Sequence, residues 1–537
     1  MKHDPRSAST LTEMMRRRAE ATPELAYFHL YGDTVTYGRF WKESGRYAAG
    51  LARAGVHAGD KVCLIYPTCA EFFYTFFGAL RIGAVPVPLY PTLGVEATAN
   101  IFRDCEAVAV ATIGWFRSGV EQSVALAPNV KQIIEPPDLE VDVSAPPLER
   151  PIESDLAFIQ YTSGSTGLPR GVMLSHANVV QTTHFMGEAA GVAAEDRIVS
   201  WLPLYHDMGL IGLCFTPPLT ATPIWLLPPD LKNPRQWLEL MTEVRATFTV
   251  SPDFGYRNCV RHVRDTSDLD LSPLKSALSG AEPVRPSTIE AFEAHFGVKD
   301  VIDPCYGLAE ATLAVAIWPR GVPRRLDGSG RFVSVGLPCR GISLRIVTPL
   351  DSETPGPSVD LPAEMEGEIC VQSPGVMQGY YKNPEATAKV LMPGGWLRTG
   401  DLGYLDRDGY LFVTGRLKDL MILGGENVVP GDIEEVVDHV AGVRYSAAVG
   451  IDSERTGTQR LFVVAEVREE TADETVRQKL VKSIVSRIHA ERGLRPARVL
   501  LVRSGTIPKT SSGKIQRSRV VDLIRTGGIN ERLLHQA

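Results

Sequence analysis

The sequence predicts an α/β fold: a large N-terminal domain of several subdomains with mostly parallel sheets, and a small, separate α+β domain at the C-terminal end. Near the N-terminus, helical and strand-like segments alternate, which is typical of a largely parallel sheet covered by helices. Beyond Gly415 the pattern changes to shorter strands and helices. The length of 537 residues, at roughly 100 to 200 residues per domain, predicts three or four packing units.

The N-terminal elements follow one another in a regular order. We expect a helix over Leu11–Ala21, a helix over 37–54, a strand over 61–66, a helix over Ala70–Arg81 and an apolar run over 84–90 bracketed by prolines. The apolar stretch 72–80 is far shorter than the roughly 20 residues needed to cross a bilayer. It therefore predicts a buried helix, and we expect no integral membrane segment.

Two segments, 136–151 and 348–366, are rich in proline and acidic residues and predict loops between subdomains. The part after Gly415 predicts a separate small domain. Its expected strands cover 446–451, 460–467 and 498–502, and its expected helices cover 431–440 and 472–491.

Composition excludes several classes of protein. Lys and Arg number 56 against 63 Asp and Glu, a formal charge of −7, which is too mild to suggest a nucleic-acid or anionic-membrane partner. With 44% hydrophobic and 22% charged residues, the chain is neither fibrous nor disordered. The N-terminus has no apolar h-region, so we expect a cytoplasmic protein. Eight cysteines without any CxxC pair disfavour a disulfide framework and a zinc site.

The segment 161–171, YTSGSTGLPRG, follows a strand-like run over 156–160. Small residues allow a loop to direct backbone N–H groups and hydroxyls at one anion. The spacing differs from the Walker motif, which needs Gly, four residues and then Gly-Lys-Ser/Thr. We interpret it as a phosphate loop, against the alternative of a flexible surface loop.

A second candidate segment, 506–517, reads TIPKTSSGKIQR. A lysine presented beside a glycine turn is a mobile point charge suited to a phosphate. Exposed lysines are usually only solvated, so this segment alone is a weak indication.

Five segments together carry a family resemblance: YTSGSTGLPRG, YGLAEAT (306–312), WLRTGDLG (396–403), TGRLKDL (414–420) and PKTSSGKIQR. In this order they closely resemble the adenylate-forming superfamily of acyl-CoA synthetases, luciferases and peptide-synthetase adenylation domains. The segment WLPLYHDMGLIG (201–212) resembles the fatty acyl-AMP ligase branch. The resemblance implies a large domain 1–415, a hinge 416–418 and a small mobile domain 419–537 that carries the adenylation lysine.

The resemblance also assigns roles to individual residues. The ATP phosphates would be bound by the loop residues Thr162, Ser163, Gly164, Ser165, Thr166 and Gly167. Arg170 stands where lysine is usual, and it keeps the charge. The adenine would be bound by Tyr306 and Gly307 and by the backbone of Gly280, Ala281 and Glu282 in SGAEP.

Further residues would handle the metal, the ribose and the chemistry. Glu310 would hold Mg²⁺, a hard cation on a hard oxygen. Asp401 would accept the ribose hydroxyls, because a carboxylate offers two acceptor oxygens. The remaining assignments are Arg416 on ribose or phosphate, Lys418 at the hinge, Lys514 as the adenylation lysine and His206 at the acyl entrance. Taken singly, each could be an ordinary turn, core or surface residue, and a lone His is often only a core residue.

This set of residues predicts an acid–thiol ligase that uses ATP, Mg²⁺ and coenzyme A or the phosphopantetheine of a carrier protein. A fatty acid carboxylate would attack the α-phosphate, with Arg170, Lys514 and Mg²⁺ supplying positive charge. The small domain would exclude water and then swing about Lys418 to admit a thiol.

Two departures from the fatty acyl-AMP ligase branch concern the acceptor. Only residues 311–335 separate the YGLAE segment from VGLP, too short for the insertion usual in carrier-loading members. The segment 423–434, LGGENVVPGDIE, resembles ordinary acyl-CoA ligases. Both departures favour coenzyme A as the acyl acceptor. The alternative is that the enzyme loads an acyl carrier protein in a polyketide or peptide pathway.

Three other functions stay open at this point. A silent sensor or scaffold is disfavoured by the joint presence of Glu310, Asp401, Arg416 and Lys514. A luciferase-like oxidase would share the adenylate. An amino-acid adenylating enzyme is disfavoured, because no aspartate stands in the usual position for the amino group, although Asp207 lies close to it.

Overall fold

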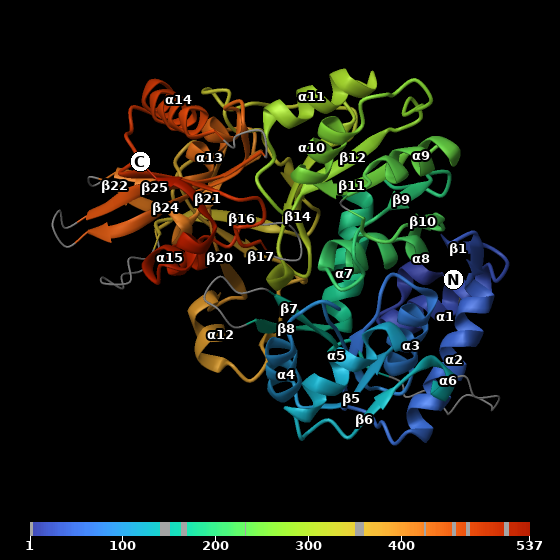
Figure 1. The fold of residues 1–537 in the computed structure, drawn as a ribbon. Helices are drawn as coiled ribbons and strands as arrows, with labels where there is room; N and C mark the ends of the chain where they lie inside the picture. The colour runs from blue at the N-terminus through green and yellow to red at the C-terminus, as the bar shows by residue number, and fades with distance from the viewer. Residues whose placement is uncertain are drawn as a thin grey trace.

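The computed structural model describes residues 4–139, 151–162, 169–230, 232–349, 359–423, 426–453, 458–468, 473–509 and 515–536. Within these ranges the fold is α/β, as the sequence predicts (Figure 1). No described helix is both long and apolar enough to cross a lipid bilayer.

The largest sheet has nine strands in the order β15-β14-β13-β12-β11-β9-β10-β1-β2. The strands from β1 to β13 in this order are parallel, and the edge strands β2, β14 and β15 are antiparallel. Their bounds are β1 Ala26–Leu30, β2 Asp33–Thr36, β9 Ile198–Ser200, β10 Ile224–Leu226, β11 Phe248–Pro252, β12 Ser276–Gly280, β13 Ile302–Gly307, β14 Ala314–Ile317 and β15 Leu337–Pro338.

Three further sheets complete the larger part of the chain. A parallel sheet has the order β4-β3-β5-β6, a second sheet is β18-β8-β7, and a third runs β16-β17-β20-β19 with β21 on β20. Their bounds are β3 Lys61–Ile65, β4 Val85–Pro88, β5 Ala107–Thr112, β6 Gln132–Ile134, β7 Leu156–Thr162, β8 Arg170–Ser175, β16 Ser343–Val347, β17 Gly367–Gln372, β18 Gly379–Tyr380, β19 Leu391–Met392, β20 Trp396–Leu405 and β21 Leu411–Arg416.

The helices of this part cover the sheets. Its α-helices are α1 Leu11–Ala21, α2 Tyr37–Arg53, α3 Ala70–Arg81, α4 Val95–Asp104, α5 Gly114–Ala125, α6 Pro136–Leu139, α7 His176–Ala189, α8 Pro217–Thr220, α9 Arg235–Glu243, α10 Asp253–His262, α11 Pro286–Phe296 and α12 Pro384–Val390. Shorter turns are η1 Pro5–Ser7, the π-helix η2 Met208–Gly212, η3 Ala309–Ala311 and η4 Leu417–Asp419.

Local sequence accounts for several boundaries. Thr10 accepts a hydrogen bond from the N–H of Glu13 at the start of α1, and Ser175 and Asn178 form a capping box at the start of α7. All residues from 72 to 80 in α3 are buried, as the apolar run predicts. The expected loop 136–151 is wrong in its first four residues, because Pro136–Leu139 forms α6, with proline at a position that favours a helix start.

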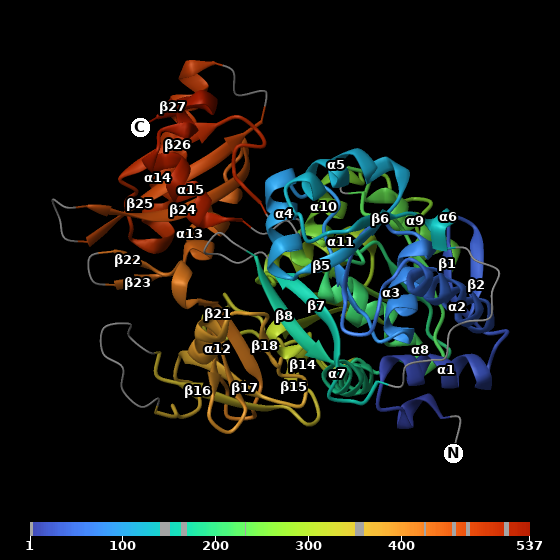
Figure 2. The ribbon, with the colours of Figure 1, turned by 90° about the horizontal axis from the view of Figure 1, so that it is seen from below.

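The C-terminal part pairs its strands separately. Among the described residues, β22 Met421–Leu423 and β23 Glu426–Val428 form one ribbon, and β24 Val443–Ser453, β25 Thr458–Val467, β26 Arg498–Val502 and β27 Leu533–Gln536 form a four-stranded sheet. They pack with α13 Pro430–Asp438, α14 Glu474–Arg492, α15 Arg517–Arg525 and η6 Gly528–Arg532. Figure 2 shows this orange-to-red body beside the gold sheet that contains β16, β17 and β21.

The eight cysteines are free thiols, six of them buried. Burial raises the pKa of Cys214 and Cys259, for example, above the ordinary value for a thiol.

Candidate active site

A cleft of about 2360 Å³ lies among the end of β13, the sheet of β20 and β21, and the C-terminal part of the chain. With the exception of Gly280, every predicted site residue that the structure describes lines it. Ser163 to Gly167 and Lys514 lie outside the described residues, so their roles stay predictions.

Three predicted nucleotide-binding residues form one connected group. The Tyr306 hydroxyl donates to Asp401 Oδ2 at 2.7 Å, and Arg416 Nε contacts Asp401 Oδ1 at 2.7 Å. Asp401 and Arg416 are direct partners in the register of β20 and β21, which explains the ion pair. Asp401 is only 3% exposed.

Asp401 affects the pKa values of the other two residues in this group. Asp401 is the main cause that raises the pKa of Arg416, while burial and then Asp401 raise the pKa of Tyr306 far above its usual value. The Tyr306 hydroxyl therefore stays neutral and donates to Asp401. Each carboxylate oxygen has two lone pairs, so both oxygens keep capacity for further donors such as sugar hydroxyls.

A second group surrounds Glu310 on η3. The Tyr380 hydroxyl donates to Glu310 Oε1 at 2.8 Å, and the Arg170 guanidinium lies 5.2 Å from the centre of the Tyr380 ring. Strand β18 pairs with β8, whose first residue is Arg170, so the sheet brings Tyr380 and Arg170 together, and Glu310 comes from η3. Burial and then Glu310 raise the pKa of Tyr380, which keeps its hydroxyl protonated.

The SGAEP segment follows β12 along the cleft. A β-carbon at Gly280 would come within 2.6 Å of Cys305 Sγ, so only glycine fits against β13 there. Ala281 has φ +65°, which turns the chain sharply. The Glu282 carboxylate accepts from the N–H of Phe254 at 2.5 Å, in the first turn of α10, while burial raises its pKa. Ala281, Glu282 and Pro283 line the cleft, while the Glu282 carboxylate contacts α10.

Gly307 is required for steric reasons. A β-carbon there would lie 1.8 Å from the carbonyl oxygen of Leu313, in the backbone that returns toward β14. The nearby Thr312 has φ +69° and donates to the carbonyl of Gly375 at 2.6 Å, which fixes the turn that carries Glu310.

His206 and Lys418 also line the cleft. The ring of His206 lies 5.4 Å from that of Tyr205, and its carbonyl accepts from Leu210 as the π-helix begins. Lys418 lies in η4, where burial, followed by Arg416, lowers its pKa.

The C-terminal part contacts the cleft through charged residues. Arg517 binds both oxygens of Glu434, at 2.8 and 2.6 Å, and contacts Asp419 at 3.0 Å, so it joins the 506–517 segment to α13 and to η4. Between the two parts of the chain, Arg331 pairs with Asp432, and Arg285 lies 3.5 Å from Asp438.

Sequence reasoning missed Tyr380, Thr399 and the role of Arg517. Thr399 Oγ1 accepts from the N–H of Asp401 at 3.1 Å, and it stands inside the WLRTGDLG motif. Tyr380 lies in GYYKN, where a tyrosine pair after glycine in a polar stretch was the available signal.

Comparisons with known proteins agree with this geometry. A family model described as AMP-binding enzyme matches residues 15–381, and one described as AMP-binding enzyme C-terminal domain matches residues 425–523. The long-chain-fatty-acid–AMP ligase FadD26 of Mycobacterium marinum is 33% identical, over 98% of this chain and 99% of its own. Its alignment spans 586 positions, more than the 537 residues here, so FadD26 has residues that this chain lacks.

A second relative and a solved structure point the same way. The medium-chain-fatty-acid–[acyl-carrier-protein] ligase JamA of Moorena producens is 32% identical, over 95% of this chain and 94% of its own. A structure from a study of fatty acyl-adenylate ligases of E. coli and L. pneumophila superposes with a TM-score of 0.87 and 29% identity, over 97% of this chain and 99% of the other.

Proposed function

The chain belongs to the AMP-binding enzyme family, is fatty acyl-AMP ligase-like and is an AMP-forming acid ligase, and we propose that it activates a medium- to long-chain fatty acid for transfer to coenzyme A. The observation that carries this proposal is the meeting of Tyr306, Asp401 and Arg416 with Glu310 and Arg170 in one cleft. The Asp401 carboxylate offers hydrogen-bond acceptors for sugar hydroxyls, and the Arg170 guanidinium offers positive charge for phosphates.

In the first step, a carboxylate oxygen of the fatty acid attacks the α-phosphorus of ATP, and the bond to pyrophosphate breaks. Asp401 holds the ribose, and Tyr306 and the SGAEP backbone border the adenine. Arg170 faces the phosphates, where a fixed cation stabilises the charge that builds up in transit. Lys514 supplies a second cation from the small domain.

Mg²⁺ fits this arrangement. Among the described residues, no cluster of three or more His, Cys, Asp or Glu side chains could hold a metal, so an ion would need phosphate oxygens as further ligands. That is how Mg²⁺ is usually bound, through one or two carboxylates and substrate phosphates. Glu310 is placed for this role, and the bound ion would neutralise phosphate charge.

In the second step, the thiolate of coenzyme A attacks the acyl carbonyl carbon, and AMP leaves with the electrons of the broken C–O bond. The small domain 419–537 turns about the hinge 416–418 between the steps. The partly desolvated Lys418 and the Arg517 contacts to Asp419 support a defined pivot here.

The choice of coenzyme A rests on the short 311–335 connection and on LGGENVVPGDIE. A carrier protein is the second candidate acceptor, favoured by the name of JamA. We propose that a carrier is at most a slower acceptor.

We therefore expect thioester to form with free coenzyme A at a rate comparable to that of adenylate formation. The measurement is mass spectrometry of products from ATP, a fatty acid and either coenzyme A or a pantetheinylated carrier. Accumulation of adenylate with coenzyme A, and discharge only by the carrier, would assign the enzyme to the carrier-loading group.

Tyr380→Phe should raise the Mg²⁺ concentration needed for half-maximal pyrophosphate release by roughly tenfold or more. Its hydroxyl orients Glu310, and a hydrogen bond to a charged group is worth about 1.5–3 kcal/mol. Tyr381→Phe is the matched control, because its hydroxyl contacts Glu106 at 3.2 Å instead. An equal Mg²⁺ requirement in both variants would remove Tyr380 from the metal site.

A further inference from the structure

The cleft has an apolar branch that enters the core between α7 and the large sheet. Its lining includes residues that are almost completely buried, such as Ile198, Phe248 and Val250, at 1%, 3% and 5% exposure. Phe248, Val250 and Pro252 alternate along β11 and thus present one face of that strand. On the other side α7 contributes Met186 and Gly187.

The dimensions of this branch can be estimated from β11. From Phe248 to Pro252 the strand advances four residues, or about 13 Å. An extended hydrocarbon chain advances roughly 1.25 Å per carbon, from the C–C bond length and angle. About ten methylene groups therefore fit along β11 below the nucleotide end of the cleft.

The deep end of the branch is formed by Ala190, Val192 and Ile198. Behind it, Arg320 donates to the carbonyl of Gly191 at 3.0 Å and lies 3.5 Å from Asp196, which is 1% exposed. These contacts fix the chain that closes the branch, so an apolar methyl end is the chemistry that suits it.

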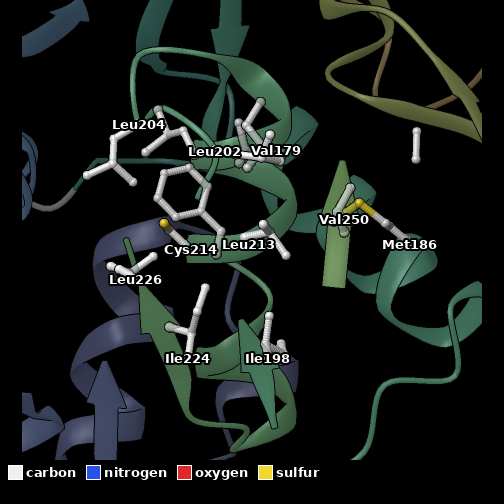
Figure 3. Packing of buried hydrophobic residues seen from close by; sticks show 14 of the residues in the cluster. Val179, Met186, Ile198, Leu202, Leu204, Leu213, Cys214, Ile224, Leu226 and Val250 are labelled. Atoms are coloured by element: carbon white, nitrogen blue, oxygen red, sulfur yellow. The ribbon is translucent and has the colours of Figure 1, made fainter. Parts of the chain in front are cut away.

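Met186 lies halfway along the branch. Figure 3 shows its side chain extending from α7 toward Val250 of β11. Both side chains line the cleft, with lining residues on either side of them. Methionine is unbranched and flexible, so it can fill the gap or turn aside. A chain that enters from the nucleotide end reaches this pair after roughly five carbons.

Two glycines keep the branch open opposite the sheet. A β-carbon at Gly212 would lie 3.1 Å from Leu313 Cδ2, and one at Gly187 would lie 3.5 Å from Thr216 Cγ2. All four residues line the cleft. Any larger side chain at either position would narrow the apolar branch.

We propose that Met186 determines the accepted acyl chain length: its side chain closes the branch beyond acids of about six carbons, and it turns aside for straight chains of about ten to twelve carbons. This inference rests on the proposed function, because it assumes that the occupant is the alkyl part of the acid substrate. It adds the substrate class: unbranched, medium-length fatty acids with an apolar end.

The test uses two opposite changes and a ladder of straight-chain acids. Met186→Trp should raise the ratio of kcat/KM for hexanoate over that for dodecanoate by about 100-fold or more, since the loss of only two methylene contacts at about tenfold each gives this change. Met186→Ala should raise the ratio for dodecanoate over hexanoate by about tenfold, because it opens the deeper half of the branch. Both ratios are measured by pyrophosphate release.

Met241→Ala is the matched control, a methionine that is 1% exposed and does not line the cleft, and it should leave both ratios unchanged. Unaltered ratios in both Met186 variants would overturn the inference while leaving fatty acid activation intact. If the wild-type enzyme releases no pyrophosphate with any straight-chain acid, the proposed function itself fails. Should Met186→Trp not fold, Met186→Ala decides alone, because it adds space.

Discussion

Asp401→Ala lowers kcat/KM for ATP by about 100-fold or more, the expected result of losing two charge-assisted hydrogen bonds worth about 1.5–3 kcal/mol each. The same carboxylate accepts a hydrogen bond from the Tyr306 hydroxyl and forms an ion pair with Arg416. Its loss therefore also removes the contacts that position these two side chains at the proposed ribose site. The measurement is an ATP titration of acyl-adenylate formation at saturating fatty acid. The dependence on fatty acid concentration should change much less, because Asp401 lies away from the apolar branch.

Two further variants separate binding from folding. Asp401→Asn keeps one acceptor for Tyr306 but no charge for Arg416, so its defect should be intermediate. Asp360→Ala removes an exposed ion pair, with Arg345 of β16 at 2.8 Å, outside the cleft, and should leave the ATP dependence unchanged. An ordinary ATP dependence in Asp401→Ala would show that the carboxylate does not contact the ribose.

Much of the fold is visible in local sequence. The helices at Leu11–Ala21 and Ala70–Arg81 have the expected bounds, because a cap or a continuous apolar run marks them. The order of nine strands in the large sheet was not predictable, because it depends on pairing between strands far apart in the chain. The same holds for the antiparallel edge made by β14 and β15.

In the candidate site too, local sequence indicates some residues, whereas their partners depend on contacts between distant parts of the chain. Motifs indicated Tyr306, Glu310 and Asp401, and the structure places these residues in one cleft. Their partners depend on tertiary contacts: the Tyr380 hydroxyl reaches Glu310 across 70 residues of sequence, and Tyr306 reaches Asp401 across 95. No spacing rule connects residues that meet only through contacts between separate sheets and turns.

Lys514→Ala should lower the adenylation rate by about 100-fold or more, the scale of removing one preorganised charge stabiliser. ATP binding should remain nearly intact, because we propose that this lysine acts only while charge builds up at the α-phosphate. After the small domain has turned, the lysine is idle, so the mutant should convert supplied acyl-adenylate to thioester at close to the wild-type rate. Pyrophosphate release follows the first half-reaction, and thioester appearance follows the second.

The Lys482→Ala variant provides the control, because this exposed lysine lies on α14 of the same domain, outside the cleft. It should leave both half-reactions unchanged. Equal damage to the two half-reactions in Lys514→Ala would mean that the lysine is structural or that the domain does not alternate. Undamaged adenylation would end its assignment as the catalytic lysine, and the cations of the first step would then be Arg170 and the Mg²⁺ on Glu310. The comparison of half-reactions is decisive because a folding defect would slow both steps, whereas a charge required at one step slows only that step.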